Sequence, residues 1–237
     1  MATTAAGAVR AERFWQKMAM GLALFIVFGF LQFALRGFVD PAKAPFWVHL
    51  HGVAMLAWLA VLIAQPTLVS RGNLALHRRL GWVGAGLALF IVCLTIFNRI
   101  ASLELRRFPP FFTPPYFLVL TTVEALAFGA VVIWAIRRRR ATDWHRRLMI
   151  GATIILLEPA LGRILPMPLM IGWSDLPIAL CQLAVVAIIA RHDRRTFGHV
   201  HPATKAIAAI VVAVRITIYV LPMTPPVIAL AERLAGS

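Results

Sequence analysis

Three ionisable residues lie inside apolar stretches of the sequence, where a charge is costly. Glu124, Glu158 and Arg215 are each flanked by long runs of apolar residues. If those runs cross a membrane, a charge near its middle costs about 2.5–3.5 kcal/mol or more. Residues of this kind pair with one another and commonly mark a path for protons, ions or substrates. They are therefore the first candidates for function.

Position along the expected helices favours Glu124 and Arg215 as partners. At a helical rise of ~1.5 Å per residue, Arg215 lies ~15 Å from the inner end of its helix and Glu124 ~13 Å from the outer end of its own. In a hydrocarbon core ~30 Å thick, the two meet near the midplane. Tyr219, one turn after Arg215, is expected to join them. An ion pair that fixes helix register and a proton or substrate path fit equally well.

Glu158 is predicted to lie nearer the outer third of the membrane. Its closest basic neighbour in sequence is Arg163. Pro159 should kink this helix, because proline removes one main-chain donor and clashes with the carbonyl four residues earlier. A freed carbonyl is then expected nearby.

A second kind of chemistry is indicated by histidines at the starts of two apolar stretches. Leu76-His77-Arg78-Arg79-Leu80 and Trp144-His145-Arg146-Arg147-Leu148 share a His-Arg-Arg-Leu segment. Neutral imidazoles at one depth on neighbouring helices can be axial ligands of a haem iron, with Arg78 and Arg146 near the propionates. Basic junctions that anchor helices at the headgroups are the alternative.

A third histidine, His51, is predicted to point into the bundle. Its helical face continues with Met55, Trp58 and Gln65, whereas the face of His49 is mainly aliphatic. His49 is therefore expected at the headgroups.

The elements that position these residues are long apolar segments. The hydrophobic fraction is 61% and the charged fraction 14%, against about 45–50% and about 25% in soluble domains. A spanning helix needs about 20 apolar residues. Residues 1–237 are predicted to form a single all-α integral membrane domain of about seven transmembrane helices. These are Phe14–Val39, Phe46–Ser70, Leu80–Ile100, Pro115–Ile136, Trp144–Leu165, Trp173–Ala190 and Ala206–Leu221.

The basic residues predict the orientation. Sixteen Lys and Arg fall at the N-terminus and in the even-numbered connections, and seven on the other side. The richer side faces the cytoplasm. With seven spans, this predicts a cytoplasmic N-terminus and a C-terminus on the outside. The net charge of +15 thus indicates the lipid bilayer and not nucleic acid as the partner.

Other features narrow the function. The connection Arg106–Tyr116 is rich in proline and aromatic residues, which fits an interfacial loop or a lid over an outer site. Pro225–Leu234 fits a short interfacial helix. Cys93 and Cys181 lie in apolar stretches and provide neither a disulfide framework nor a thiolate metal site. No zincin motif, phosphate-binding glycine loop or GxSxG elbow is present, and no enzyme activity is assigned.

The histidine motifs resemble those of poorly characterised bacterial multi-pass membrane proteins with His-Arg-x-Leu-Gly and His-Arg-x-Met segments. The resemblance covers roughly Trp47 to Arg163. It implies that the membrane is a bacterial inner membrane and that the outside is the periplasm. This pattern of histidine motifs is in turn similar to that of transmembrane cytochromes b of the ascorbate-reducible and ferric-reductase kind. It implies His77, His145 and His51 as haem-ligand candidates. A cytochrome with two haems needs four histidines, paired at two depths. His51 has no clear partner here, unless Met167 or Met170 is the second ligand. The resemblance therefore implies one haem b, held by His77 and His145.

Two hypotheses follow from the sequence. The first is a haem-b-binding membrane protein that acts in electron transfer or cofactor assembly, with a redox partner or quinone. The second is a cofactor-free transporter of a small molecule or ion, or a membrane sensor, with Glu124 and Arg215 at its centre.

Overall fold

The chain is all helical in the residues that the structure describes. The computed structural model describes residues 2–236, with side chains from residue 12 onward. Six helices in this part are long and apolar enough to cross a membrane, and no strand occurs among the described residues. The protein is therefore a multi-pass integral membrane protein. The chain forms two compact units, residues 1–91 and 92–237.

The first unit contains α1 (Ala2–Leu35), α2 (Phe46–Ser70) and the first part of α3 (Leu74–Glu104), with the 3-10 turn η1 (Pro41–Lys43) between α1 and α2. The two long helices α1 and α2 pack against each other, and Gln16 Nε2 donates to Ser70 Oγ at 2.6 Å. α2 has the bounds that the sequence predicted.

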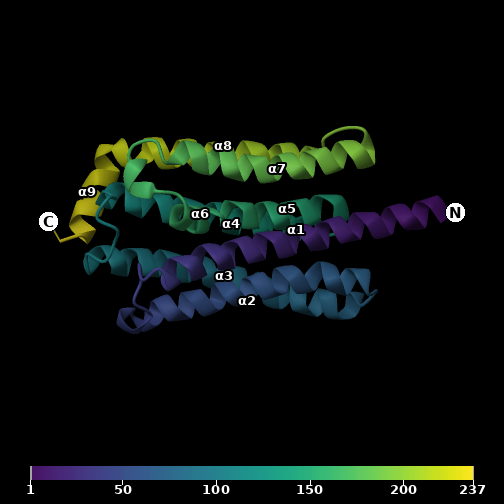
Figure 1. Ribbon diagram of the computed structural model, residues 1–237, viewed down its shortest axis with the longest axis horizontal. Helices are drawn as coiled ribbons and strands as arrows, with labels where there is room; N and C mark the ends of the chain where they lie inside the picture. The colour runs from purple at the N-terminus through teal and green to yellow at the C-terminus, as the bar shows by residue number, and fades with distance from the viewer. Residues whose placement is uncertain (1, 237) are drawn as a thin grey trace. The chain divides into compact units, whose positions relative to one another are not determined.

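The second unit contains the end of α3 and the remaining helices. These are α4 (Pro114–Arg137), α5 (Thr142–Ile155), α6 (Glu158–Ile164), α7 (Asp175–Phe197), α8 (Pro202–Val220) and α9 (Pro225–Leu234), with 3-10 turns η2 (Met167–Leu169) and η3 (Leu221–Met223). α4 packs against α5, α8 and α9, and α7 packs along α8 (Figure 1). One cluster of the hydrophobic core is formed by aliphatic side chains of α4 and α8, namely Val119, Leu120, Val214 and Ile218.

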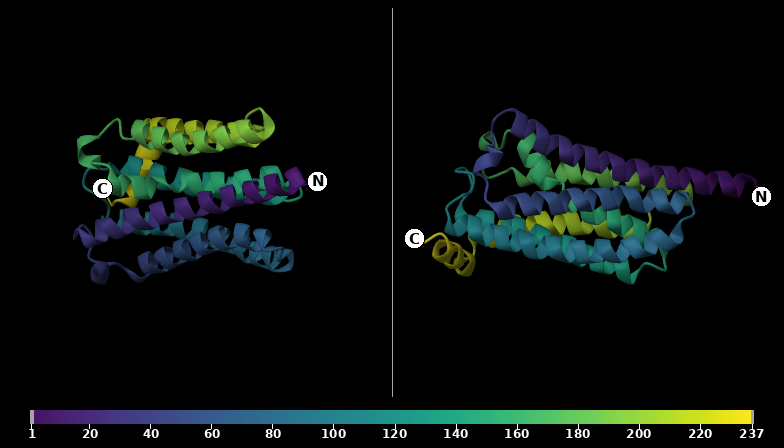
Figure 2. Two further views of the ribbon diagram at one scale, coloured as in Figure 1. Left: turned by 45° about the vertical axis from the view of Figure 1, so that its right-hand side comes forward. Right: turned by 90° about the horizontal axis from the view of Figure 1, so that it is seen from below.

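The termini of these helices follow from their sequences. Thr113 caps α4 and is followed by proline, whose fixed φ suits the first turn. α7 ends at Gly198, whose φ of +78° is the left-handed conformation that glycine favours. α9 has the predicted bounds and turns away from the direction of α8 (Figure 2).

The predicted fifth span, Trp144–Leu165, is not one continuous helix. It is divided into α5 and α6 at Leu156 and Leu157. The two together run back alongside α4 (Figure 1). Pro159 explains the break, as predicted, because it cannot donate to the carbonyl of Ile155.

Large apolar side chains remain exposed in the middle of the long helices. In the second unit they include Leu126, Ile133, Leu180, Ile188 and Ile216, each more than half exposed. A water-soluble protein does not leave such an extensive apolar surface uncovered. These side chains therefore contact lipid.

Candidate functional site

Arg215 of α8 binds carboxylates from two other helices. Its Nη2 donates to Oε1 of Glu124 in α4, and its Nη1 lies 3.4 Å from Oδ1 of Asp175 at the start of α7. Arg215 and Glu124 are 4% and 3% exposed. The predicted Glu124–Arg215 pair is present. Asp175 is a second partner that sequence analysis missed, because an acidic residue in the first turn of a helix is ordinary.

Glu158, the first residue of α6, is an electrostatic neighbour of this pair. Its side chain is buried. Two nearby carboxylates in an apolar environment repel each other, which favours a proton on one of them. Arg163, one turn later in α6, is an electrostatic neighbour of Glu158. We call Glu124, Glu158, Arg163, Asp175 and Arg215 the charge cluster.

The break between α5 and α6 places Glu158 in the cluster. Because Pro159 cannot donate to it, the carbonyl of Ile155 needs another partner. Gln182 of α7 provides it: its Nε2 donates to the carbonyl oxygens of Ile155 at 3.1 Å and Ile154 at 3.0 Å. Gln182 is 1% exposed. The break in the main chain is thus stabilised by one buried side chain from a neighbouring helix.

Tyr116 extends the cluster towards the start of α4. Its hydroxyl donates to Oδ2 of Asp175 at 3.1 Å. Asp175 is 13% exposed, so this end of the cluster is the more accessible one. The structure does not bring Tyr219 into the network: its side chain is 50% exposed. A separation of one helical turn from Arg215 was not enough to predict that Tyr219 belongs to the charge cluster.

A guanidinium with unused donors lies beside the cluster. Arg99, near the end of α3, stacks on Phe117 with Cζ 3.4 Å from the ring centroid. Its Nε is buried and has no hydrogen-bond partner in the described part of the chain. Glu124, Glu158 and Arg163 are its electrostatic neighbours. Arg163 itself donates from Nη1 to the carbonyl of Pro159 at 2.7 Å.

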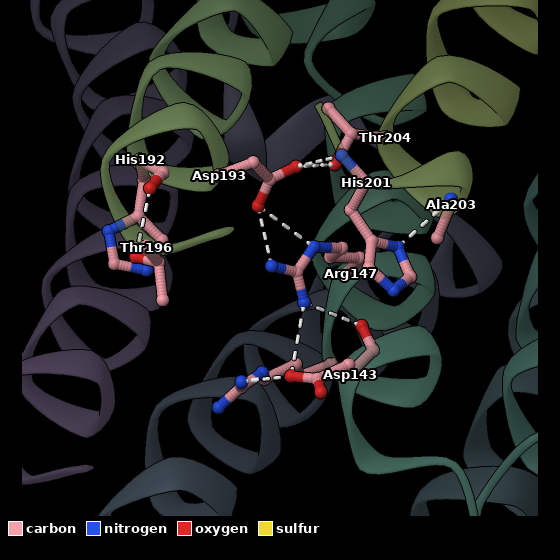
Figure 3. A network of polar contacts seen from close by, with 9 residues as sticks. Asp143, Arg147, His192, Asp193, Thr196, His201, Ala203 and Thr204 are labelled. Carbon is pink, nitrogen blue, oxygen red and sulfur yellow. Dashed lines mark hydrogen bonds and ion pairs between the residues drawn. The ribbon is translucent and has the colours of Figure 1, made fainter. Parts of the chain in front are cut away.

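A second buried polar network lies at the other end of α8 (Figure 3). Asp193 of α7 accepts hydrogen bonds from Nε and Nη2 of Arg147 at 3.0 and 2.5 Å, from the hydroxyl of Thr204 at 2.5 Å and from the N–H of His201 at 3.1 Å. Nη1 of Arg147 donates to the carbonyl of Asp143 at 2.8 Å. Asp193 and Arg147 are 0% and 1% exposed, and each is well provided with partners. This network ties α5, α7 and α8 together.

His201 caps α8 within this network. Its Nδ1 accepts from the N–H of Ala203 at 3.1 Å, which requires an unprotonated Nδ1. Burial lowers the pKa of His201 below its ordinary value, and the nearby Arg147 guanidinium lowers it further. The neutral imidazole is therefore the form that fits the cap.

The predicted haem ligands have different surroundings. His145 Nδ1 lies 2.9 Å from the carbonyl oxygen of Ala135. Since a carbonyl only accepts, Nδ1 donates, and Nε2 then holds the lone pair that a metal needs. His77 is held differently: the Gln65 amide nitrogen donates to its Nδ1, while the amide oxygen accepts from Gly81 N–H at 3.0 Å. Its Nε2 then carries the proton, so His145 fits a ligand and His77 in this arrangement does not.

The remaining predicted residues of the haem hypothesis are placed as follows. Arg78 is exposed, and Arg146 forms an ion pair with Asp143. His51 is partly buried and His49 exposed, which agrees with the predicted choice of helix face. Among the described residues, no group of three or more His, Cys, Asp or Glu side chains could hold a metal ion.

Comparison with known proteins found no related protein. No family model, curated protein or solved structure matches the chain.

Proposed function

We propose that this membrane protein is a proton-coupled secondary transporter, with the proton held between Glu124 and Glu158. The observation that supports this most is that Glu124 and Glu158, two electrostatically neighbouring glutamates, are both buried, with Arg215 bound to Glu124. In an apolar environment two neighbouring carboxylates repel strongly, so a shared proton stabilises the pair. Release of that proton leaves a repelling pair, which can drive a change of conformation.

The broken helix supports the same function. Irregular main chain at membrane depth is tolerated where it is buried in protein or lines a path, and transporters commonly place binding groups at such breaks. In this chain the break presents Glu158 to the cluster, and the carbonyls it frees are held only by the Gln182 side chain and one local turn. A side-chain contact is more easily exchanged than a ladder of main-chain hydrogen bonds.

The membrane orientation belongs to this proposal. The positive-inside distribution places the N-terminus and the Arg147–Asp193 network on the cytoplasmic side of a bacterial inner membrane. Asp175 and Tyr116 then lie towards the periplasm. At ~1.5 Å per residue, Thr204 and Arg215 are ~16 Å apart along α8. The proton site and the inner network thus lie at different depths.

Proteoliposomes test the proposed function directly. The purified protein is reconstituted with a pH-sensitive dye inside, and panels of small neutral, cationic and anionic solutes are added outside. We expect one class of solute to acidify the lumen, and Glu124→Gln and Glu158→Gln each to abolish that proton movement. Glu104→Gln, which changes an exposed carboxylate at the end of α3, is the matched control and should behave as wild type.

Proton movement that survives both glutamate substitutions contradicts the assignment of the proton site. The absence of proton movement with every solute class, relative to protein-free liposomes, contradicts the transport function.

A haem-b protein of electron transfer or cofactor assembly is the second candidate. The geometry of His145 and Ala135 favours it, because that contact leaves Nε2 of the imidazole as the lone-pair atom. A reduced-minus-oxidised absorption spectrum of protein produced with ample haem tests it. A haem band that is lost in His145→Ala supports this candidate, and a colourless protein excludes it.

A further inference from the structure

Arg99 is a partly buried arginine beside the charge cluster that the proposed proton site does not use. In a membrane protein a buried arginine is expensive unless its donors are paired. Arg99 has the ring of Phe117 on one face, a buried Nε without a hydrogen-bond partner among the described residues, and no carboxylate within ion-pair distance there. Arg99 as a whole is only partly buried, so its terminal nitrogens are the donors that an anion from outside the chain can reach.

The charges around Arg99 point the same way. The charge cluster holds three carboxyl groups, Glu124, Glu158 and Asp175, and two arginines, Arg163 and Arg215. With one proton shared between Glu124 and Glu158, its net charge is zero. Arg99 then adds one positive charge that nothing in the described part of the unit neutralises. One bound monovalent anion restores neutrality at this depth.

Aromatic rings lie close to the guanidinium of Arg99. Phe117 stacks on it, and Phe108 and Phe112, from the connection between α3 and α4, lie 5.2 and 6.2 Å from Phe117 between ring centroids. A guanidinium presents paired donors that match a planar carboxylate. Aromatic rings close to the guanidinium favour a ligand whose remaining part is apolar.

We infer that Arg99 and the rings of Phe108, Phe112 and Phe117 bind a small monocarboxylate with an apolar body, which crosses together with the proton of Glu124 and Glu158. The inference rests on the proposed transport function and names its substrate class. One negative charge and one proton cross together, so transport is electroneutral. A phosphate dianion leaves a net negative charge, and its hydration suits neither the rings nor the depth.

Binding is measured first, on purified full-length protein in detergent. The probes are benzoate and butyrate, with benzamide as the neutral analogue and inorganic phosphate as the competing anion. We expect a carboxylate to raise the melting temperature in a concentration-dependent way, and benzamide and phosphate to have no such effect. Loss of charged hydrogen bonds should weaken carboxylate binding ~10- to 100-fold in Arg99→Gln.

Two further variants keep this test decisive. Arg99→Lys retains the charge without the paired donors, so it should bind a carboxylate more weakly than wild type and more tightly than Arg99→Gln. It also serves if Arg99→Gln fails to fold. Arg107→Gln changes an exposed arginine close by in the chain and should bind as wild type. Equal binding by wild type and the Arg99 variants overturns the inference, as does tighter binding of phosphate than of either carboxylate.

Transport separates failure of this inference from failure of the proposed function. In dye-loaded proteoliposomes, benzoate or butyrate should carry protons inward faster than in protein-free liposomes, into which the neutral acids diffuse unaided, and a potassium diffusion potential should not change the protein-dependent rate. Proton movement driven only by solutes other than monocarboxylates overturns the inference and leaves the transport function intact. Carboxylate binding that depends on Arg99, with no proton movement, overturns the transport function and leaves the binding site.

Discussion

Removing one member of the Glu124–Arg215 pair should destabilise the protein by amounts that the structure sets separately for each residue. Arg215→Gln leaves Glu124 beside Glu158 without its ion-pair partner. Breaking a buried pair in this way costs about 3–5 kcal/mol. Glu124→Gln costs less, about 1–3 kcal/mol, because Arg215 keeps Asp175 at 3.4 Å. The two substitutions are therefore predicted to be unequal, with Arg215→Gln the more severe.

The double variant shows whether the residues are partners. Glu124→Gln combined with Arg215→Gln leaves neither member of the pair charged, so it should recover part of the larger loss. We expect a favourable coupling energy of about 1–3 kcal/mol.

The assay is thermal unfolding in detergent, followed by intrinsic tryptophan fluorescence. At about 2–4 °C per kcal/mol for a chain of this size, Arg215→Gln should lower the melting temperature by about 6–20 °C. Glu104→Gln, on an exposed carboxylate, should change stability by less than about 0.5 kcal/mol. Simple addition of the two single losses would refute the reasoning, because independent residues add and partners do not. Equal losses in the two single variants would refute the role given to Asp175.

Three further predictions concern the contacts that hold the second unit. Gln182→Leu should cost about 1–3 kcal/mol, because it leaves the carbonyl of Ile155 without its donor; unfolding in detergent measures the loss, and an unchanged melting temperature contradicts the capping role. A Cβ at Gly151 would overlap the side chain of Ile207, so Gly151→Ala should lower the melting temperature, and Ile207→Ala should restore part of it; no rescue contradicts the contact. The stability of wild type should fall as pH drops through about 6.5, since the unfolded chain binds a proton at His201 more readily than the folded one does. His201→Asn keeps a helix cap that does not titrate, so it should reduce the dependence of the melting temperature on pH in this range. An unchanged pH dependence contradicts the role given to His201.

The ends of two helices and one ion pair were predictable from the sequence. They depend on apolar length, proline positions and the number of residues along a helix, all of which can be read from the sequence. Apolar length and proline positions predicted α2 and α9 with the bounds that the structure has. The depth of Glu124 and Arg215 follows from counting residues along a helix, and their contact confirms that prediction. The predicted break near Pro159 is also present, although the sequence did not show that it ends the helix.

Asp175 in the charge cluster and Arg99 beside it could not be found in this way. Asp175 begins a helix and Arg99 lies near the end of one, so both resemble ordinary residues at the membrane surface. Their positions relative to Glu124 and Arg215 depend on which helices are neighbours, and apolar periodicity does not determine that arrangement. Gln182 is similar: a polar residue in an apolar helix is noticeable, but its two carbonyl partners exist only because α5 ends beside α7. The haem hypothesis stays a prediction that the absorption spectrum tests.

The two polar networks of the second unit differ in a way that bears on function. Each oxygen of the Asp193 carboxylate accepts two hydrogen bonds, and Arg147 donates from all three of its nitrogens, so this network is nearly saturated by the chain itself. A saturated network of this kind rigidifies the helices that it joins. The charge cluster differs, because it contains two buried glutamates, and beside it lies an arginine whose Nε has no partner in the described residues. Under the proposed function, an exchangeable proton and a bound anion satisfy these groups, which are otherwise costly in lipid. The proposal therefore assigns a rigid role to one end of α8 and proton and ligand exchange to the other.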